Sequence, residues 1–203
     1  IQCSVDAGEL GRIHLLEETG FRFVEFRYRK ILDLNIFHKI DDLSFYPYYI
    51  KLISEEEDFK EAEKLVNSKS ADDRFSRDPI IKKEISQKRL QAYLKKSFTN
   101  YPGEFIYGLY NKHRPGLYAI RTGLLNNKYE VIFGQTALNE KIDIEKYTHM
   151  IDTLVINQLI NKGFQFFYTV TSGYNISEMD LHISGLHYRV EATWVILRKI
   201  YRE

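Results

Sequence analysis

The chain has 203 residues, which suits one domain with an appendage or two small domains. A hydrophobic share of 44%, a charged share of 28% and a net charge of +1 are ordinary for a globular protein, and we do not expect nucleic acid as a partner. No apolar run approaches the roughly 18 residues of a membrane span, and no signal peptide is recognised. The single cysteine, Cys3, excludes an internal disulfide framework. We therefore expect a cytoplasmic protein with no membrane partner.

The first 33 residues predict a small β-α-β piece. Apolar and polar side chains alternate over residues 21–31, as in a half-buried strand. The alternation slips by one residue near Val24, which indicates a β-bulge. Gly20 is a natural stop for the helix that precedes this strand. The predicted elements are a strand over residues 1–5, a helix over residues 9–18 and a strand over residues 21–31.

A connection over residues 34–46 leads into a larger unit in which strands and helices follow in the order β-α-α-β-β-β-α-β-α-β. Its predicted strands cover residues 48–54, 104–110, 117–124, 129–138, 164–171 and 188–201. Its predicted helices cover residues 58–66, 80–98, 147–162 and 176–184. Gly163 is expected to end the third of these helices. Consecutive strands on short turns, followed by alternating helices and strands, indicate an α/β (α+β) protein with a mixed sheet flanked by helices.

Four segments give this order a family resemblance. They read LLEETGFRFVEFRYR from Leu15, RFSRDP from Arg74, FGQTAL from Phe133 and TSGYN from Thr171. With the element order, they resemble the GNAT N-acetyltransferase superfamily and, within it, the dTDP-fucosamine N-acetyltransferases. The resemblance covers nearly the whole chain. It implies a truncated GNAT-like half-domain over residues 1–36 and a GNAT-like acyltransferase domain over residues 37–203.

The same resemblance implies a ligand, acetyl-CoA as co-substrate, and a set of residues around it. Thr136, Ala137 and Leu138 lie in the strand that would pair with the pantetheine arm, and Asn175 would contact the coenzyme. Arg74 and Arg77 lie in the segment that would bind the acceptor. That acceptor would be a small-molecule amine, and more narrowly a nucleotide-linked amino sugar. The sequence leaves open whether the chain forms a homodimer.

One departure from the family pattern falls where the coenzyme's pyrophosphate would bind. The pattern is Q/R-x-x-G-x-G/A, whose backbone N–H groups and helix N-terminus hold the two phosphates. Aligned back from Gly163, it falls on residues 143–148, and Lys146 and Thr148 replace the glycines. Side chains and two carboxylates therefore stand where an anion should approach, and Lys146 and the Thr148 hydroxyl compensate only in part. The alternative interpretation is a solvated loop in which Asp143 or Thr148 caps a helix.

A second departure concerns the acid that would protonate the leaving thiolate. The resemblance implies a tyrosine in the short helix after Asn175, and His182 takes its position. Histidine can act as an acid near neutral pH, and Glu178, one helical turn earlier, could orient it. Two alternatives stay open: His182 packs or caps near the helix end, and Asn175 with Glu178 forms an N-cap. If His182 is only a packing residue, Tyr174 and Tyr188 are the other candidate acids.

The helix over residues 80–98 is strongly basic, which indicates either a solvated face or a rim that binds phosphate groups together with Arg74 and Arg77. Its basic residues are Lys82, Lys83, Lys88, Arg89, Lys95 and Lys96. The histidines show no metal-ligand spacing, so we expect no metal site.

Two functions compete on these observations. The first is an acyl-CoA-dependent N-acyltransferase with His182 as the acid. The second is a non-catalytic GNAT-like binding module with a degenerate pyrophosphate loop.

Overall fold

The computed structural model describes residues 1–37, 39, 41–68, 83–139 and 143–200. Its strands are β1 (Gln2–Asp6), β2 (Arg22–Leu32), β3 (Tyr48–Leu52), β4 (Glu104–Asn111), β5 (Leu117–Leu125), β6 (Glu130–Leu138), β7 (Phe166–Ser172) and β8 (Tyr188–Arg198). Its helices are α1 (Leu10–Glu18), α2 (Glu56–Ser68), α4 (Lys83–Thr99), α5 (Ile144–Asn161) and α6 (Ile176–Asp180), with a short 3₁₀ helix η1 (Asp42–Phe45) and a π-helical turn η2 (Leu181–Gly185). In this part of the chain no helix is both long and apolar enough to cross a membrane.

The predicted elements and their order are confirmed, and most ends differ by one to three residues. Gly20 and Gly163 follow the ends of α1 and α5 with φ of +93°, a conformation that glycine adopts without strain. Helix α5 begins at Ile144 and not at Tyr147, because the Asp143 side chain accepts a hydrogen bond from the backbone N–H of Lys146 and caps the earlier turn. The first part of the helix expected over residues 80–98 lies outside the described residues.

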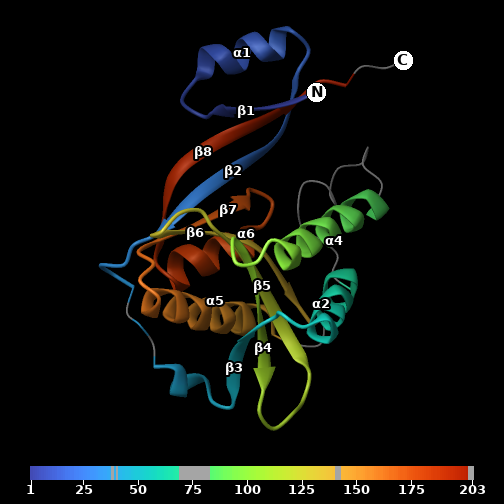
Figure 1. Cartoon of the computed structure of the whole chain (residues 1–203). Helices are drawn as coiled ribbons and strands as arrows, with labels where there is room; N and C mark the ends of the chain where they lie inside the picture. Colours follow the sequence, from blue (N-terminus) through green and yellow to red (C-terminus); the bar gives the residue numbers. More distant parts are fainter. Residues whose placement is uncertain (38, 40, 69–82, 140–142, 201–203) are drawn as a thin grey trace.

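All eight strands form one sheet in the order β1-β8-β2-β7-β6-β5-β4-β3. Among the described residues, β6 and β7 are the parallel pair, and the other neighbouring strands are antiparallel. Strand β2 comes from the first 33 residues, yet it lies between β7 and β8, two of the last strands of the chain (Figure 1). The expected bulge in β2 is present, since the register with β8 shifts between Phe23 and Glu25. The division at residue 36 stays a prediction.

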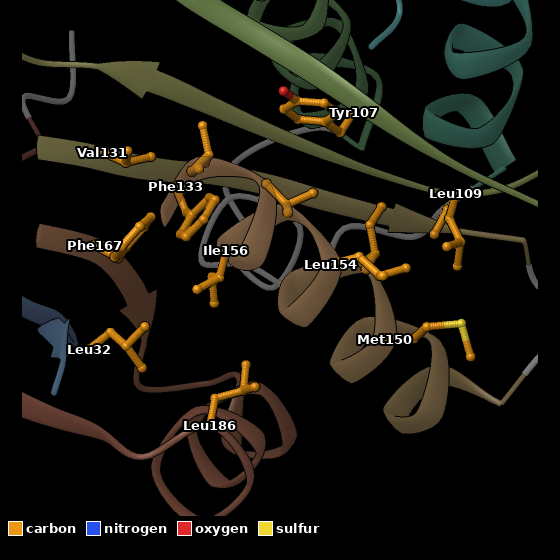
Figure 2. Close-up of a cluster of buried hydrophobic side chains, with 14 of the residues drawn as sticks. Leu32, Tyr107, Leu109, Val131, Phe133, Met150, Leu154, Ile156, Phe167 and Leu186 are labelled. Atoms are coloured by element: carbon orange, nitrogen blue, oxygen red, sulfur yellow. The ribbon is translucent and has the colours of Figure 1, made fainter. Parts of the chain in front are cut away.

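Helix α5 covers one face of the sheet, and α2 and α4 cover the other (Figure 1). On the first face, Met150, Leu154 and Ile156 of α5 pack against side chains from the central strands, such as Phe133 and Phe167 (Figure 2). On the second face, the rings of Phe59 and Phe98 stack with centroids 4.3 Å apart, and Leu94 is fully buried. The central strands are buried on both faces, and their sequences are therefore nearly continuous runs of apolar residues.

A third, smaller cluster holds the N-terminal piece. Val5 of β1 and Ile13 of α1 pack against Val195 and Leu197 of β8. In Figure 1, β1 and α1 stand at the far end of β2 and β8, away from the helices of the larger unit. This piece therefore attaches to the rest of the molecule along β2 and β8.

Candidate functional site

The site begins where two parallel strands separate. Strands β6 and β7 pair over four residues each, from Glu130 with Phe166 to Phe133 with Thr169. Beyond that point β6 continues its pairing with β5 as far as Leu138, and β7 continues its pairing with β2 as far as Ser172. A cleft of about 980 Å³ runs through this gap and is lined by both strands, α4, the N-terminal part of α5, and α6. The backbone edge of β6 beyond Phe133 therefore faces the cleft and not a neighbouring strand.

Strand β6 has a bulge at this point. Gly134 and Gln135 lie opposite Thr122 of β5, whose hydroxyl oxygen accepts a hydrogen bond from the Gln135 N–H at 2.8 Å. A Cβ on Gly134 would collide with that hydroxyl, so the close approach requires glycine. Below the bulge, the Arg121 guanidinium donates to the Gly134 carbonyl at 3.3 Å and to the Thr136 hydroxyl. The bulge and Arg121 together keep the β6 edge turned toward the cleft.

A chain of buried polar side chains crosses the gap on the face that α5 covers. Arg121 Nε lies 3.0 Å from one carboxylate oxygen of Asp152, and the other oxygen lies 3.2 Å from His182 Nε2. His182 Nδ1 lies 2.7 Å from Lys30 Nζ, which donates to the Thr171 hydroxyl at 2.6 Å. All five side chains of this polar network are at most 1% exposed. Arg121 and Asp152 are a buried pair of opposite charges, whereas Lys30 is held by two hydrogen-bond partners, Thr171 and His182.

The surroundings set the protonation states. Burial is the main reason that the pKa of Lys30 falls to about 8, and Arg121 lowers it further. Burial also lowers the pKa of His182, against the opposing effect of Asp152. Asp152 keeps a lowered pKa despite its burial, because Arg121 and His182 favour the carboxylate. A neutral His182 that accepts from Lys30 at Nδ1 and donates to Asp152 at Nε2 satisfies both contacts.

Comparisons with known proteins bear on this architecture. No family model matches the sequence, and no curated protein is similar to it. Among solved structures, a GCN5-related N-acetyltransferase from Sphaerobacter thermophilus aligns over 98% of this chain with a TM-score of 0.69 and 10% identity. A GCN5-related N-acetyltransferase from Kribbella flavida aligns over 99% with a TM-score of 0.65 and 11% identity. A tandem GNAT protein from the clavulanic acid biosynthesis pathway aligns over 97% with a TM-score of 0.61 and 13% identity.

The fold is that of the GNAT acetyltransferases. The chain spans 58%, 68% and 62% of the length of these three proteins, respectively. At this low identity the likeness establishes the GNAT fold, and the residues of this chain must carry any argument about chemistry.

The structure brings most of the expected coenzyme residues to one cleft. Thr136, Ala137 and Leu138 line it from β6, as the GNAT resemblance implies, and Thr148 lines it from α5. Asn175 also lines it, and its side chain caps α6 by accepting from the Glu178 N–H at 3.3 Å, as the capping interpretation expects. These are observations of position; the binding roles stay predictions.

Other expected residues lie elsewhere. Lys146 does not line the cleft; it borders a second, smaller cavity with Ser44 and His149. His182 is fully buried behind the cleft wall. Of the two other candidate acids, Tyr174 donates to the Val24 carbonyl at 2.5 Å, and the buried Tyr188 ring lies 5.0 Å from the His182 ring. Arg74 and Arg77 lie outside the described residues. In the described chain, no group of three or more His, Cys, Asp or Glu is placed to hold a metal ion.

The N-terminus of α5 is acidic, and one of its carboxylates lines the cleft. The Asp143 carboxylate accepts a hydrogen bond from the Lys146 N–H. Glu145 lines the cleft, and so does Glu178 of α6. In many anion sites a helix N-terminus offers its N–H groups to a phosphate. Here one of those groups already binds a carboxylate of the chain itself.

The cleft is also lined by charged side chains of β2 that sequence reasoning did not single out, next to Arg89 of the expected basic rim. Glu25 and Arg27 of β2 line it together with Arg89 and Tyr93 of α4. The Ser172 hydroxyl donates to the Glu25 carboxylate. The only sequence signal was the slip in alternation near Val24, which moves Glu25 to the face of β2 that lines the cleft.

We predict that the buried Lys30 makes stability depend on alkaline pH. Its pKa is about 8 in the folded chain and near 10.5 when exposed, so between these values the unfolded state binds more protons. The free energy of unfolding should therefore rise with pH across this window, relative to Lys30→Met, by a slope approaching about 1.4 kcal/mol per pH unit. Urea unfolding of both proteins from pH 7.5 to pH 10.5 measures this difference. Lys88→Met, at an exposed position, serves as control, and a Lys30→Met difference that stays constant with pH would contradict the assignment.

Proposed function

We propose that the chain is an acyl-CoA-dependent N-acyltransferase that acts on a primary amine. The observation that carries this proposal is the open backbone edge of β6 in the gap between β6 and β7. An extended molecule with amide groups can pair with such an edge as an added strand would. The pantetheine arm of coenzyme A is a molecule of that kind, and the GNAT fold supports the same assignment.

The cleft suits the extended arm of an acyl donor better than it suits the donor's phosphates. Backbone groups around Thr136, Ala137 and Leu138 would hold the extended arm, and Asn175 would border it. At the α5 N-terminus, Asp143 and Glu145 would lie near the phosphates, where their charge opposes binding. We therefore expect acetyl-CoA to bind mainly through its arm and thioester, with a weak phosphate contribution from Thr148; Lys146, which borders the second cavity, takes no part.

The reaction needs a proton at the leaving group. An acyl thioester supplies the acyl group. Its carbon gains a bond to the nitrogen of the neutral amine and loses its bond to sulfur, which leaves as a thiolate. The nitrogen gives up one proton to solvent as the amide forms, and the thiolate takes up one. Thr171 lines the cleft, and its hydroxyl accepts from Lys30 Nζ. Thr171 can pass its own proton into the cleft and recover one from Lys30. A lysine with a pKa of about 8 is a far better donor at neutral pH than an ordinary lysine.

His182 acts in this proposal through Lys30. Its Nδ1 holds Lys30 Nζ at 2.7 Å, and Asp152 fixes the imidazole from the other side. The sequence pointed to His182 as the acid. Both side chains are buried, but Thr171 belongs to the cleft lining and His182 does not, so Thr171 is the member of the network that would hand on the proton. His182 is then a positioning residue that orients Lys30.

The acceptor is a small-molecule amine. A nucleotide-linked amino sugar stays a narrower proposal, and it depends on the segment that contains Arg74 and Arg77. The competing proposal is a binding module without catalysis, and the acidic residues at the α5 N-terminus are the observation in its favour.

We predict that removing the carboxylates near the α5 N-terminus strengthens donor binding. Asp143→Ser keeps a helix cap and removes a charge, and Glu145→Gln removes a charge at constant shape. Each should lower the Kd for acetyl-CoA severalfold, because an anionic phosphate no longer meets a carboxylate. Calorimetric titration measures this, with Glu191→Gln on β8 as a matched control away from the cleft. Unchanged affinity in both variants would mean that the phosphates bind elsewhere. If the unaltered protein gives no heat of binding at millimolar acetyl-CoA, the proposed acyltransferase activity is refuted.

We predict that turnover falls as the pH rises through about 8, since the acid must be protonated to act. His182→Gln should lower kcat by about 10²–10⁴-fold and shift the pH at which activity is lost, because Lys30 loses its partner. The KM for acetyl-CoA should change much less. Release of free coenzyme A from acetyl-CoA and a mixture of primary amines, followed from pH 6 to 9.5, measures both. A His182→Gln protein with the same pH profile as the unaltered protein would show that His182 only packs.

A further inference from the structure

A carboxylate lies in the cleft wall one helical turn before the buried network. Glu178 of α6 and His182 of η2 are four residues apart on adjoining helical segments, so their side chains lie on the same side. His182 reaches the buried Lys30, with 2.7 Å between Nδ1 and Nζ, whereas Glu178 lines the cleft. Thr171, whose hydroxyl lies 2.6 Å from Lys30 Nζ, lines the same cleft. The helix therefore brings a carboxylate close to the place where the network meets the cleft.

The charge of Glu178 acts on this network. Burial is the main reason that the pKa of Lys30 falls to about 8, and Glu178 is the charged group that opposes this fall most. Burial also lowers the pKa of His182, and Glu178 is among the groups that oppose that change as well. Glu178 is thus within electrostatic reach of the acid that would serve the leaving group.

The Glu178 carboxylate is held in place but carries no ion pair. The Asn175 side chain donates from Nδ2 to Glu178 Oε2 at 2.5 Å, and its Oδ1 accepts from the Glu178 N–H at 3.3 Å. Within the described residues, Oε1 has no hydrogen-bond partner and no basic side chain pairs with Glu178. Glu104, by contrast, lines the cleft with Lys96 at 2.9 Å. Glu145 also lines the cleft, but it lies on α5 and not on the segment that carries the network's histidine.

Acyl transfer to an amine needs a group that takes a proton from nitrogen. An ordinary primary amine has a pKa of about 10.4, so it arrives as an ammonium and loses one proton to solvent before it attacks. As the carbon–nitrogen bond forms, the nitrogen becomes positively charged and far more acidic, and a carboxylate can then take its second proton. The same carboxylate can first hold the ammonium through a charge-assisted hydrogen bond.

We propose that Glu178 is a further catalytic residue, whose Oε1 binds the ammonium of the acceptor and takes the proton that the nitrogen loses as the amide forms. The electron pair of the broken N–H bond stays on the nitrogen. Glu178 passes its proton to solvent, and Lys30 recovers from solvent the proton that Thr171 gave to the thiolate, so the protons balance. The binding of the ammonium stands without acyl transfer; only the proton transfer rests on the proposed function.

Binding is tested without any acyl donor. Propylamine and propanol are titrated into ¹⁵N-labelled protein, and the backbone amide shifts of residues 175–181 are followed by NMR. Propylamine should bind about tenfold or more tightly than propanol, because a hydrogen bond to a charged group contributes that much affinity. Glu178→Gln should remove this preference at constant shape. Asp180→Asn is the matched control, because Asp180 lies on the same helix, accepts from the Ser184 hydroxyl at 2.9 Å and does not line the cleft.

Turnover tests the proton transfer. The assay uses acetyl-CoA and the primary amine that gives the fastest release of coenzyme A, at pH 6, where Lys30 stays protonated. Glu178→Gln should lower kcat by about 10²-fold or more and leave the KM for acetyl-CoA nearly unchanged. Formate should restore part of the rate of Glu178→Ala, because a free carboxylate can replace a missing base but cannot repair a misfolded helix.

Three results would overturn the inference. Glu178→Gln keeps the preference for propylamine over propanol, or an active protein loses no more turnover in Glu178→Gln than in Asp180→Asn, or formate restores nothing to Glu178→Ala. Each of these leaves the proposed function standing if the unaltered protein releases coenzyme A. Conversely, a protein that binds propylamine through Glu178 and releases no coenzyme A with any amine would refute the proposed function and leave the ammonium site in place.

Discussion

The separation of β6 from β7 is the constraint on which the site depends. Each strand leaves its parallel neighbour because it stays paired on its other side, β6 with β5 and β7 with β2. The backbone hydrogen bonds lost across the gap are replaced below it by buried side chains. Arg121 holds β6 and Lys30 holds β7, and Asp152 with His182 joins the two. Charges buried in this way specify one arrangement of the two strands, because breaking any pair leaves a partner unpaired.

Strand β2 links the N-terminal piece to this site. It pairs with β7 beside the gap, it supplies Lys30 to the buried network, and Glu25, which follows its bulge, lines the cleft. A short piece that looked like an appendage in the sequence is thus part of the cleft wall.

The strands and helices could be predicted from periodicity and from glycine stops, since these are local signals. The sheet order could not, because nothing in the alternation of β2 says that it inserts between β7 and β8. For the same reason Lys30 was missed, although a lysine beside Ile31 and Leu32 at the apolar end of a strand was a weak signal. Contact between Lys30 and His182 joins residues 152 positions apart, which no local pattern encodes.

Hydrogen–deuterium exchange with and without acetyl-CoA tests most directly whether the edge of β6 binds the acyl donor. Backbone amides of residues 134–138 should exchange more slowly when acetyl-CoA is present, because the donor would pair with that edge. Those of β4, on the far side of β5, should not change. Protection that appears instead around Lys146 and the smaller cavity, or no protection of residues 134–138 at saturating acetyl-CoA, would contradict the proposed site.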